Sequence, residues 1–205
     1  MTAQTVILWR HGQTTFNNTG KFQGHIDTEL DDSGRAQVRR SAPVIASARP
    51  VRIVTSDLRR ATQTAAALAE LVHIEPESDS RLRETAYGKW EGLTRAEVQQ
   101  RWPDELTSWT GGNDDPTHGG ESRRSSATRV ADAIKEYIAS TAGGTLVVVG
   151  HGGSLRGAVG QLLELPLSSW DRFAVPQNSY WAVLEQRRQG LTLTQFNLGP
   201  GVVAD

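Results

Sequence analysis

Apolar residues gather in short extended runs, separated by longer stretches in which they recur at helical spacing. The runs are rich in β-branched and aromatic residues, and they predict strands over 5–9, 51–55, 145–149, 180–184 and 191–196. The stretch 58–72 places its apolar residues on one helical stripe, and so does 130–138. Strands that alternate with helices predict an α/β fold. We expect a three-layer sandwich with a mostly parallel central sheet and helices on both faces.

Local signals at three other places add to this outline. Thr-Arg-Ala-Glu at 94–97 has the pattern of a capping box, so a helix is expected to begin there. A further helix is expected over 33–47, and Pro43 should kink or end it. The Gly- and Asp-rich stretch 111–120 is predicted to be a long loop, either a lid or a disordered insert.

Small, polar and basic residues follow three of the predicted strands. They are Arg-His-Gly at 10–12, Ser-Asp-Leu-Arg-Arg at 56–60 and Gly-His-Gly-Gly-Ser at 150–154. Ligands bind at the carboxyl ends of strands in open α/β sheets, so these three ends are expected to converge on one site. Ser56 is expected to cap the next helix, whose free N–H groups favour an anion. The apolar stripe of that helix leaves Arg59 nearly opposite the core and Arg60 on its flank, so Arg60 should face the site.

Each of these features also has an ordinary structural explanation. A single histidine after a strand is more often structural than catalytic, arginine pairs usually lie on solvated helix surface, and paired glycines usually make a turn. Gly150-His151-Gly152 begins like a dinucleotide-binding fingerprint, but Leu155 stands where the third Gly is needed. The nucleophile-elbow pattern also fails, because Arg156 replaces its final Gly. The anion site is favoured because three such strand ends occur together.

Composition narrows the classes of function. The 205 residues are expected to form one domain, 1–205. A formal net charge of −1, from 22 basic and 23 acidic residues, argues against a nucleic-acid or membrane-surface partner. The chain has no Cys, which excludes disulfides and thiolate zinc sites and favours the cytoplasm. With neither a signal-peptide start nor a membrane-spanning run, we expect a soluble protein with a small-molecule partner, and we leave a homodimer open.

Several motifs follow one another along nearly the whole chain. They are Arg-His-Gly-Gln-Thr at 10–14, the stretches 17–24 and 56–61, Leu-Arg-Glu at 82–84 with 87–88 and 90–92, and the stretches 118–122 and 151–153. In this order they resemble the motifs of the histidine phosphatase (phosphoglycerate mutase-like) superfamily. Within its phosphatase branch, the stretches 81–85, 116–122 and 165–170 look most like actinobacterial phosphatases.

The resemblance implies roles for the candidate site residues. His11 would be the nucleophile that forms a phosphohistidine, and Glu84 would be the proton donor. The other residues would bind the transferring phosphoryl group or lie near it: Arg10, Arg60 and His151, with Asn17, Gln23, Gly24 and Gly152 around them.

The chemistry of these residue types agrees with such roles. Phosphoryl transfer needs positioned cations and an in-line nucleophile. A neutral imidazole can attack phosphorus and so divide hydrolysis into two steps. A carboxyl group beside an anionic substrate is expected to stay protonated near neutral pH, to protonate the leaving alkoxide and then to act as a base toward water. The sequence has no carboxylate cluster of the kind that holds a metal, so we predict a reaction without metal or cofactor.

Three functions stay open from the sequence. The leading hypothesis is a metal-independent phosphomonoesterase for a small phosphorylated metabolite. The others are a cofactor-dependent phosphoglycerate mutase and a phospho-ligand binding or regulatory module, although a binding module would not need Glu84. Superfamily mutases are similar but longer, with paired arginines in an insertion. Here only 36 residues, 85–120, separate Glu84 from Glu121, and they contain no Arg pair.

Some residues near the motifs have weaker assignments. His25 and His118 are candidate substrate contacts, and Arg123 and Arg124 could bind a carboxylate. Three tryptophans either wall the cleft or, by default, pack in the core: Trp90, Trp102 and Trp109.

Overall fold

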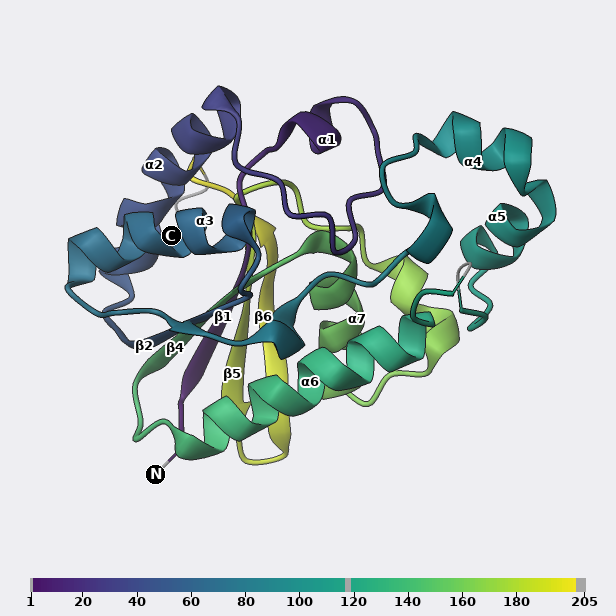
Figure 1. Ribbon diagram of the computed structural model, residues 1–205. Helices are drawn as coiled ribbons and strands as arrows, with labels where there is room; N and C mark the ends of the chain where they lie inside the picture. Colours follow the sequence, from purple (N-terminus) through teal and green to yellow (C-terminus); the bar gives the residue numbers. More distant parts are fainter. Residues whose placement is uncertain (1, 117–118, 202–205) are drawn as a thin grey trace.

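The computed structural model describes residues 2–116 and 119–201, and within these ranges six strands form one mixed sheet (Figure 1). The strands are β1 (Thr5–Arg10), β2 (Pro50–Thr55), β3 (Glu77–Ser78), β4 (Thr145–Gly150), β5 (Trp181–Arg187) and β6 (Gly190–Leu198). Their order is β3-β2-β4-β1-β5-β6. The first four strands in this order pair in parallel, whereas β5 is antiparallel to both β1 and β6. The α/β class and the mostly parallel sheet are therefore confirmed. All five predicted strands are found, and the two-residue β3 is added to them.

Helices cover both faces of the sheet. They are α1 (Thr15–Asn18), α2 (Asp32–Ser47), α3 (Arg59–Val72), α4 (Arg95–Arg101), α5 (Pro103–Thr110), α6 (Arg123–Ser140) and α7 (Gly152–Leu162), with the 3₁₀ helices η1 (Ser80–Leu82), η2 (Gly88–Trp90) and η3 (Leu167–Arg172). α2 and α3 lie on one face, and α6 and α7 on the other (Figure 1). This is the expected three-layer arrangement. No helix in the described ranges has the length and hydrophobicity of a membrane span.

The capping box at 94–97 is confirmed, and the helix predicted over 33–47 is present as α2. Thr94 caps α4, and Glu97 completes the capping box. In α2 the helix continues through Pro43 to Ser47, so of the two predicted effects Pro43 does not end the helix, and a kink there stays a prediction. Val38 and Ile45, on either side of the proline, are both buried in the core between the sheet and the helices α2 and α3. Their burial holds both halves of the helix in place despite the lost hydrogen bond.

Ser56 does not cap α3, contrary to the prediction. The helix begins at Arg59, and its N-cap is Leu58, which has no side-chain cap. Ser56 lies two residues earlier, and its Oγ accepts the N–H of Leu58 at 3.3 Å. The serine therefore shapes the turn that leads into the helix.

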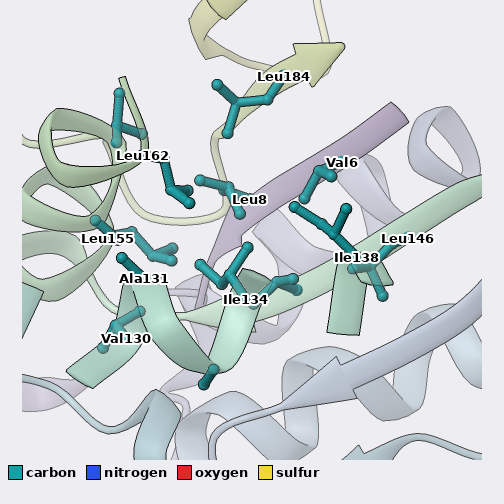
Figure 2. Packing of buried hydrophobic residues seen from close by; sticks show 14 of the residues in the cluster. Val6, Leu8, Val130, Ala131, Ile134, Ile138, Leu146, Leu155, Leu162 and Leu184 are labelled. Carbon is teal, nitrogen blue, oxygen red and sulfur yellow. The ribbon is translucent and has the colours of Figure 1, made fainter. Parts of the chain in front are cut away.

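The side chains of β1 alternate between two cores. Val6 and Leu8 pack with α6 and α7, where Figure 2 shows them near Ile134. Ile7 and Trp9 pack with α2 and α3 on the other face. A strand that is buried on both faces has no polar alternation, because successive side chains point to opposite faces. The strand predicted over 5–9 therefore contributes side chains to the cores on both faces of the sheet.

The first three predicted strand ends lie at one edge of the sheet. β1 and β4 pair in parallel with Arg10 opposite Gly150, and the His11 N–H donates to the Gly150 carbonyl at 3.0 Å. At the end of β2, the Ser56 N–H donates to the Val149 carbonyl at 2.9 Å. The three ends converge as expected.

A third apolar cluster lies beside this edge and joins η2, α4 and α5 (Figure 1, teal). Its buried members are Tyr87, Trp90, Val98 and Leu106, with Phe22, Leu93, Trp102 and Trp109 packed against them. Trp90, which is fully buried, and Trp102 therefore pack in a core, which was the default expectation for these tryptophans.

Candidate active site

Two buried histidines stand at the tips of β1 and β4. The ring centroids of His11 and His151 are 5.1 Å apart, and the planes are tilted by 60°. Burial lowers the pKa of each ring well below its usual value, and the nearby charges of Arg60 and Arg10 lower it further. Both imidazoles are therefore neutral at neutral pH.

The hydrogen bonds of the two rings assign opposite tautomers. His11 Nδ1 lies 2.6 Å from the Gly12 carbonyl, which can only accept, so Nδ1 has the proton and Nε2 has a lone pair. His151 Nδ1 accepts the Arg60 Nε–H at 3.2 Å, so its proton is on Nε2. That Nε2 is buried and has no partner within the described residues. The pair thus offers one nucleophilic nitrogen and one free N–H donor.

Arg60 is fully buried and faces the site, as predicted. It donates from Nη1 to the Ile26 carbonyl and from Nη2 to the Gly24 carbonyl, each at 2.8 Å. Burial lowers its pKa to about 10, so the guanidinium stays charged at pH 7. Arg59 points outward and pairs with Glu29, with 57% of its side chain exposed.

Arg10 brings a second guanidinium to the same place. Its Nη1 donates to the Pro176 carbonyl at 2.6 Å. Its Nε is buried and has no partner in residues 2–116 or 119–201. Gly152, the first residue of α7, lies against it, and a Cβ there would meet Arg10 Nε at 3.0 Å and Val175 Cγ1 at 2.6 Å. Only glycine leaves room for this arginine.

Glu84 lies at the amino end of α7. Its Oε2 accepts the Gly153 N–H at 2.9 Å, and its Oε1 accepts the N–H groups of Ser154 at 2.7 Å and Thr85 at 2.9 Å. His25 does not line the cavity. Instead, its Nε2 donates to the Glu84 carbonyl at 2.9 Å, so it holds the backbone of the carboxyl residue.

Two amide side chains complete the polar wall. Asn17 Oδ1 accepts from the Thr14 N–H and from Asn178 Nδ2, both at 3.1 Å. Gln23 Oε1 accepts the hydroxyls of Thr14 and Thr28. Because both oxygens are occupied and both residues line the cavity, their NH₂ groups are the ends available to an anion.

One cavity brings most of the candidate residues together. It has an empty volume of about 850 Å³, counting its open mouth, and its polar lining includes Arg10, His11, Asn17, Gln23, Arg60, Glu84 and Gly152. Two candidate residues are not among those that line the cavity: Gly24, whose carbonyl accepts from Arg60, and His151, which is fully buried beside His11. His118 lies outside the described residues. In the described part of the chain, no group of three or more His, Asp or Glu could hold a metal ion.

The sequence interpretation missed part of the lining. Lys21 and Arg156 add positive charge, and Phe22, Tyr87 and Trp170 add aromatic surface beside the expected Trp109. Arg156 could have been found, because it lies one helical turn after Gly152 and so shares its face of α7. No periodic signal marks Trp170, which follows α7 in the short helix η3.

The chain matches the histidine phosphatase superfamily (branch 1) over residues 6–199, and it belongs to this superfamily. It is 38% identical to a glucosyl-3-phosphoglycerate phosphatase of Mycobacterium tuberculosis over 192 residues, covering 90% of this chain and 86% of that protein. It is 30% identical to phosphoserine phosphatase 1 of Hydrogenobacter thermophilus, covering 89% and 88%. A mycobacterial glucosyl-3-phosphoglycerate phosphatase solved with VO3 superposes with a TM-score of 0.91 at 35% identity, covering 96% of this chain and all of that one.

The two neutral histidines should make the folded protein less stable as the pH falls below 6.5. In the unfolded chain both rings titrate near 6.5, whereas the folded state keeps the pKa of each well below that value. The unfolded state therefore binds more protons, and the free energy of unfolding should fall by up to ~1.4 kcal/mol per pH unit for each ring. Urea unfolding at pH 7.5, 6.5 and 5.5 in phosphate-free buffer measures this slope.

His151→Asn should reduce the fall between pH 6.5 and 5.5 by about half, because one of two titrating rings is removed. The fall from pH 7.5 to 6.5 should be only about a third as large, because the unfolded rings become half protonated by pH 6.5 and almost fully protonated by pH 5.5. A protein that gained stability on acidification to pH 5.5 would contradict the assignment.

Proposed function

We propose that this protein is a phosphomonoesterase that hydrolyses a small phosphorylated metabolite through a phosphohistidine on His11. The main support is the pair of neutral imidazoles in opposite tautomers, close to the charges of Arg60 and Arg10. Membership of the histidine phosphatase superfamily and the phosphatase names of its relatives support the same reaction.

The phosphoryl group would bind where free donors meet. Arg10 Nε and His151 Nε2–H are buried donors without partners in the described chain, and the NH₂ groups of Asn17 and Gln23 line the same cavity. Arg60, which lines the cavity and donates to His151 Nδ1, would add its charge. Charge in the transition state spreads over three equatorial oxygens, and donors fixed beforehand stabilise it at no further cost of reorganisation.

The reaction would take two steps. His11 Nε2 attacks phosphorus, the N–P bond forms and the ester P–O bond breaks, while Glu84 gives its proton to the leaving alkoxide. The Gly12 carbonyl, bonded to His11 Nδ1–H, stabilises the positive charge that develops on the ring. The Glu84 carboxylate then takes a proton from a water, which attacks phosphorus and breaks the N–P bond. Inorganic phosphate leaves, and both side chains return to their first states.

We propose that no metal or other cofactor takes part. The described residues supply the positive charge that phosphoryl transfer needs through Arg10 and Arg60, together with the N–H donor of His151. They supply no cluster of metal-ligating side chains.

The proposed substrate is a phosphorylated acid or its glycoside, with glucosyl-3-phosphoglycerate as the first candidate. The similarity to glucosyl-3-phosphoglycerate phosphatases supports this choice. The aromatic lining formed by Phe22, Tyr87, Trp109 and Trp170 would give a sugar ring apolar surface to pack on.

The two alternative functions, a mutase and a phospho-ligand binding module, have different structural requirements from a phosphatase. A mutase needs further cations for a second anionic group, and Lys21, Arg123 and Arg156 do line the cavity. It also needs a cover that excludes water from the phosphohistidine. The short connection 85–120 offers little of one. A binding module would need the cations but not Glu84.

We also propose a cytoplasmic location, one domain over 1–205, a possible homodimer, and no nucleic-acid or membrane partner. The near-neutral charge and a metabolite substrate support these choices. Cell fractionation and the mass measured by light scattering test the location and the oligomeric state.

His11→Ala should lower phosphate release by ~10³-fold or more, because the covalent step is lost. With ³²P-labelled substrate, rapid quenching in alkali, in which a phosphohistidine is stable, should trap a phosphoenzyme in the wild type and none in the variant. Arg59→Ala is the control, since Arg59 lies on the outer face of the same site helix. A reaction that a chelator abolished, or that His11→Ala retained, would overturn the mechanism. With 3-phosphoglycerate and catalytic 2,3-bisphosphoglycerate, isomerisation faster than phosphate release would identify a mutase instead.

Glu84→Gln should affect substrates according to their leaving groups. A poor leaving group needs the proton, so kcat on an alkyl phosphate should fall by ~10²-fold or more. An aryl phosphate with an acidic phenol should lose clearly less. The two rates are measured on the same enzyme preparation, and equal losses on both would remove Glu84 from the role of proton donor.

A further inference from the structure

A second pair of arginines lines the cavity, away from Arg10 and Arg60. Arg123 is the first residue of α6, and Arg156 lies on α7. Both bind the carboxylate of Asp171, from η3. Arg123 forms two hydrogen bonds to it, from Nη1 to Oδ2 at 2.9 Å and from Nη2 to Oδ1. Arg156 Nη1 lies 3.2 Å from Oδ1.

The charges of this cluster do not balance. The side chain of Arg123 is 8% exposed and that of Arg156 is 16% exposed, so two cations lie close together in a poorly solvated wall. Burial and the charge of Arg123 lower the pKa of Arg156, and Asp171 raises it. The carboxylate of Asp171 pairs with two guanidinium groups, so the cluster has a net charge of about +1. The cavity wall can therefore hold another negative group.

Asp171 is the component that can move. Its side chain is 45% exposed, whereas both arginines are held in the wall. The Arg123 guanidinium lies 5.8 Å from the ring centroid of Trp109, which packs it from the side of α5. The loop after α5 covers the outer side of the ion pair, where a Cβ on Gly112 would meet Asp171 Oδ2 at 3.2 Å and Arg123 Nη1 at 3.5 Å.

We propose that Arg123 and Arg156 form a second anion subsite, which Asp171 occupies in the empty enzyme and which a substrate carboxylate takes over on binding. The proposal rests on the proposed phosphatase function, because the subsite lies in the same cavity as the phosphoryl donors. A planar carboxylate matches the paired donors of an arginine fork, and Asp171 is itself an example of the group that fits. The enzyme would thereby select phosphate esters of carboxylic acids.

A purely structural explanation makes the opposite prediction for one variant. If Asp171 only clamps the arginines in position, Asp171→Asn should weaken binding of a carboxylate ligand. If Asp171 occupies the subsite in place of the substrate, the same substitution should strengthen that binding, because the competing charge is gone. The two explanations therefore differ in the sign of the effect.

The test compares two ligands that differ in the carboxylate. Binding of 3-phosphoglycerate and of glycerol 3-phosphate is measured by calorimetry in the His11→Ala background, which removes turnover. Arg123→Gln and Arg156→Gln should each reduce the preference for 3-phosphoglycerate by about 10-fold or more, since a hydrogen bond between charged groups is lost. Asp171→Asn should increase that preference several-fold. Arg124→Gln is the matched control, because Arg124 is 56% exposed and pairs with Asp114 instead.

The outcomes separate this proposal from the proposed function. Wild-type enzyme that releases no phosphate from any ester, including an aryl phosphate, would overturn the phosphatase. Phosphate release together with unchanged preference in both arginine variants would overturn the subsite alone. A lower preference in Asp171→Asn would show that Asp171 is a clamp. Melting temperatures confirm that each variant is folded, and if an arginine variant is not, the sign of the Asp171→Asn effect decides.

Discussion

The site depends on holding two guanidinium groups, one fully buried and one partly buried, beside two imidazoles. Arg60 donates to His151 Nδ1 and so sets its tautomer, while burial first and the charges of Arg60 and Arg10 second lower the pKa of His11 and keep its ring neutral. Buried charge is costly unless it is compensated. Here the carbonyls of Gly24, Ile26 and Pro176 accept hydrogen bonds from the two arginines and so compensate part of this cost. The same arrangement leaves N–H groups that an arriving anion can satisfy.

The fold explains why these groups meet. Parallel pairing of β1 with β4 brings the residues after each strand together, so His11 and His151 are neighbours although 140 positions separate them. The phosphoryl half of the cavity is built on these strand ends. The other half comes from α5, α6, α7 and η3, and it contains aromatic residues and the two arginines, Arg123 and Arg156, that pair with Asp171. Phosphoryl chemistry and substrate selection would thus belong to different parts of the chain.

Sequence pattern predicted the part of the site that local structure determines. The apolar run 5–9 located the tip of β1, and the stripe of α3 correctly distinguished buried Arg60 from exposed Arg59. The pattern failed where tertiary packing decides. Ser56 lost its expected cap because the helix begins two residues later, and Asp171 reaches Arg123 and Arg156 through the path of the chain after α7. Neither position has a periodicity that single-sequence reasoning can use.

The central claim is that both imidazoles are neutral at pH 7 and have opposite tautomers. Nitrogen-15 NMR of histidine-labelled protein tests it directly, because protonated and unprotonated ring nitrogens have distinct chemical shifts. Asn variants of His11 and His151 assign the signals. The account predicts a proton on Nδ1 of His11 and on Nε2 of His151, with the other nitrogen of each ring unprotonated. A doubly protonated ring at either position, or the same tautomer at both, would contradict it.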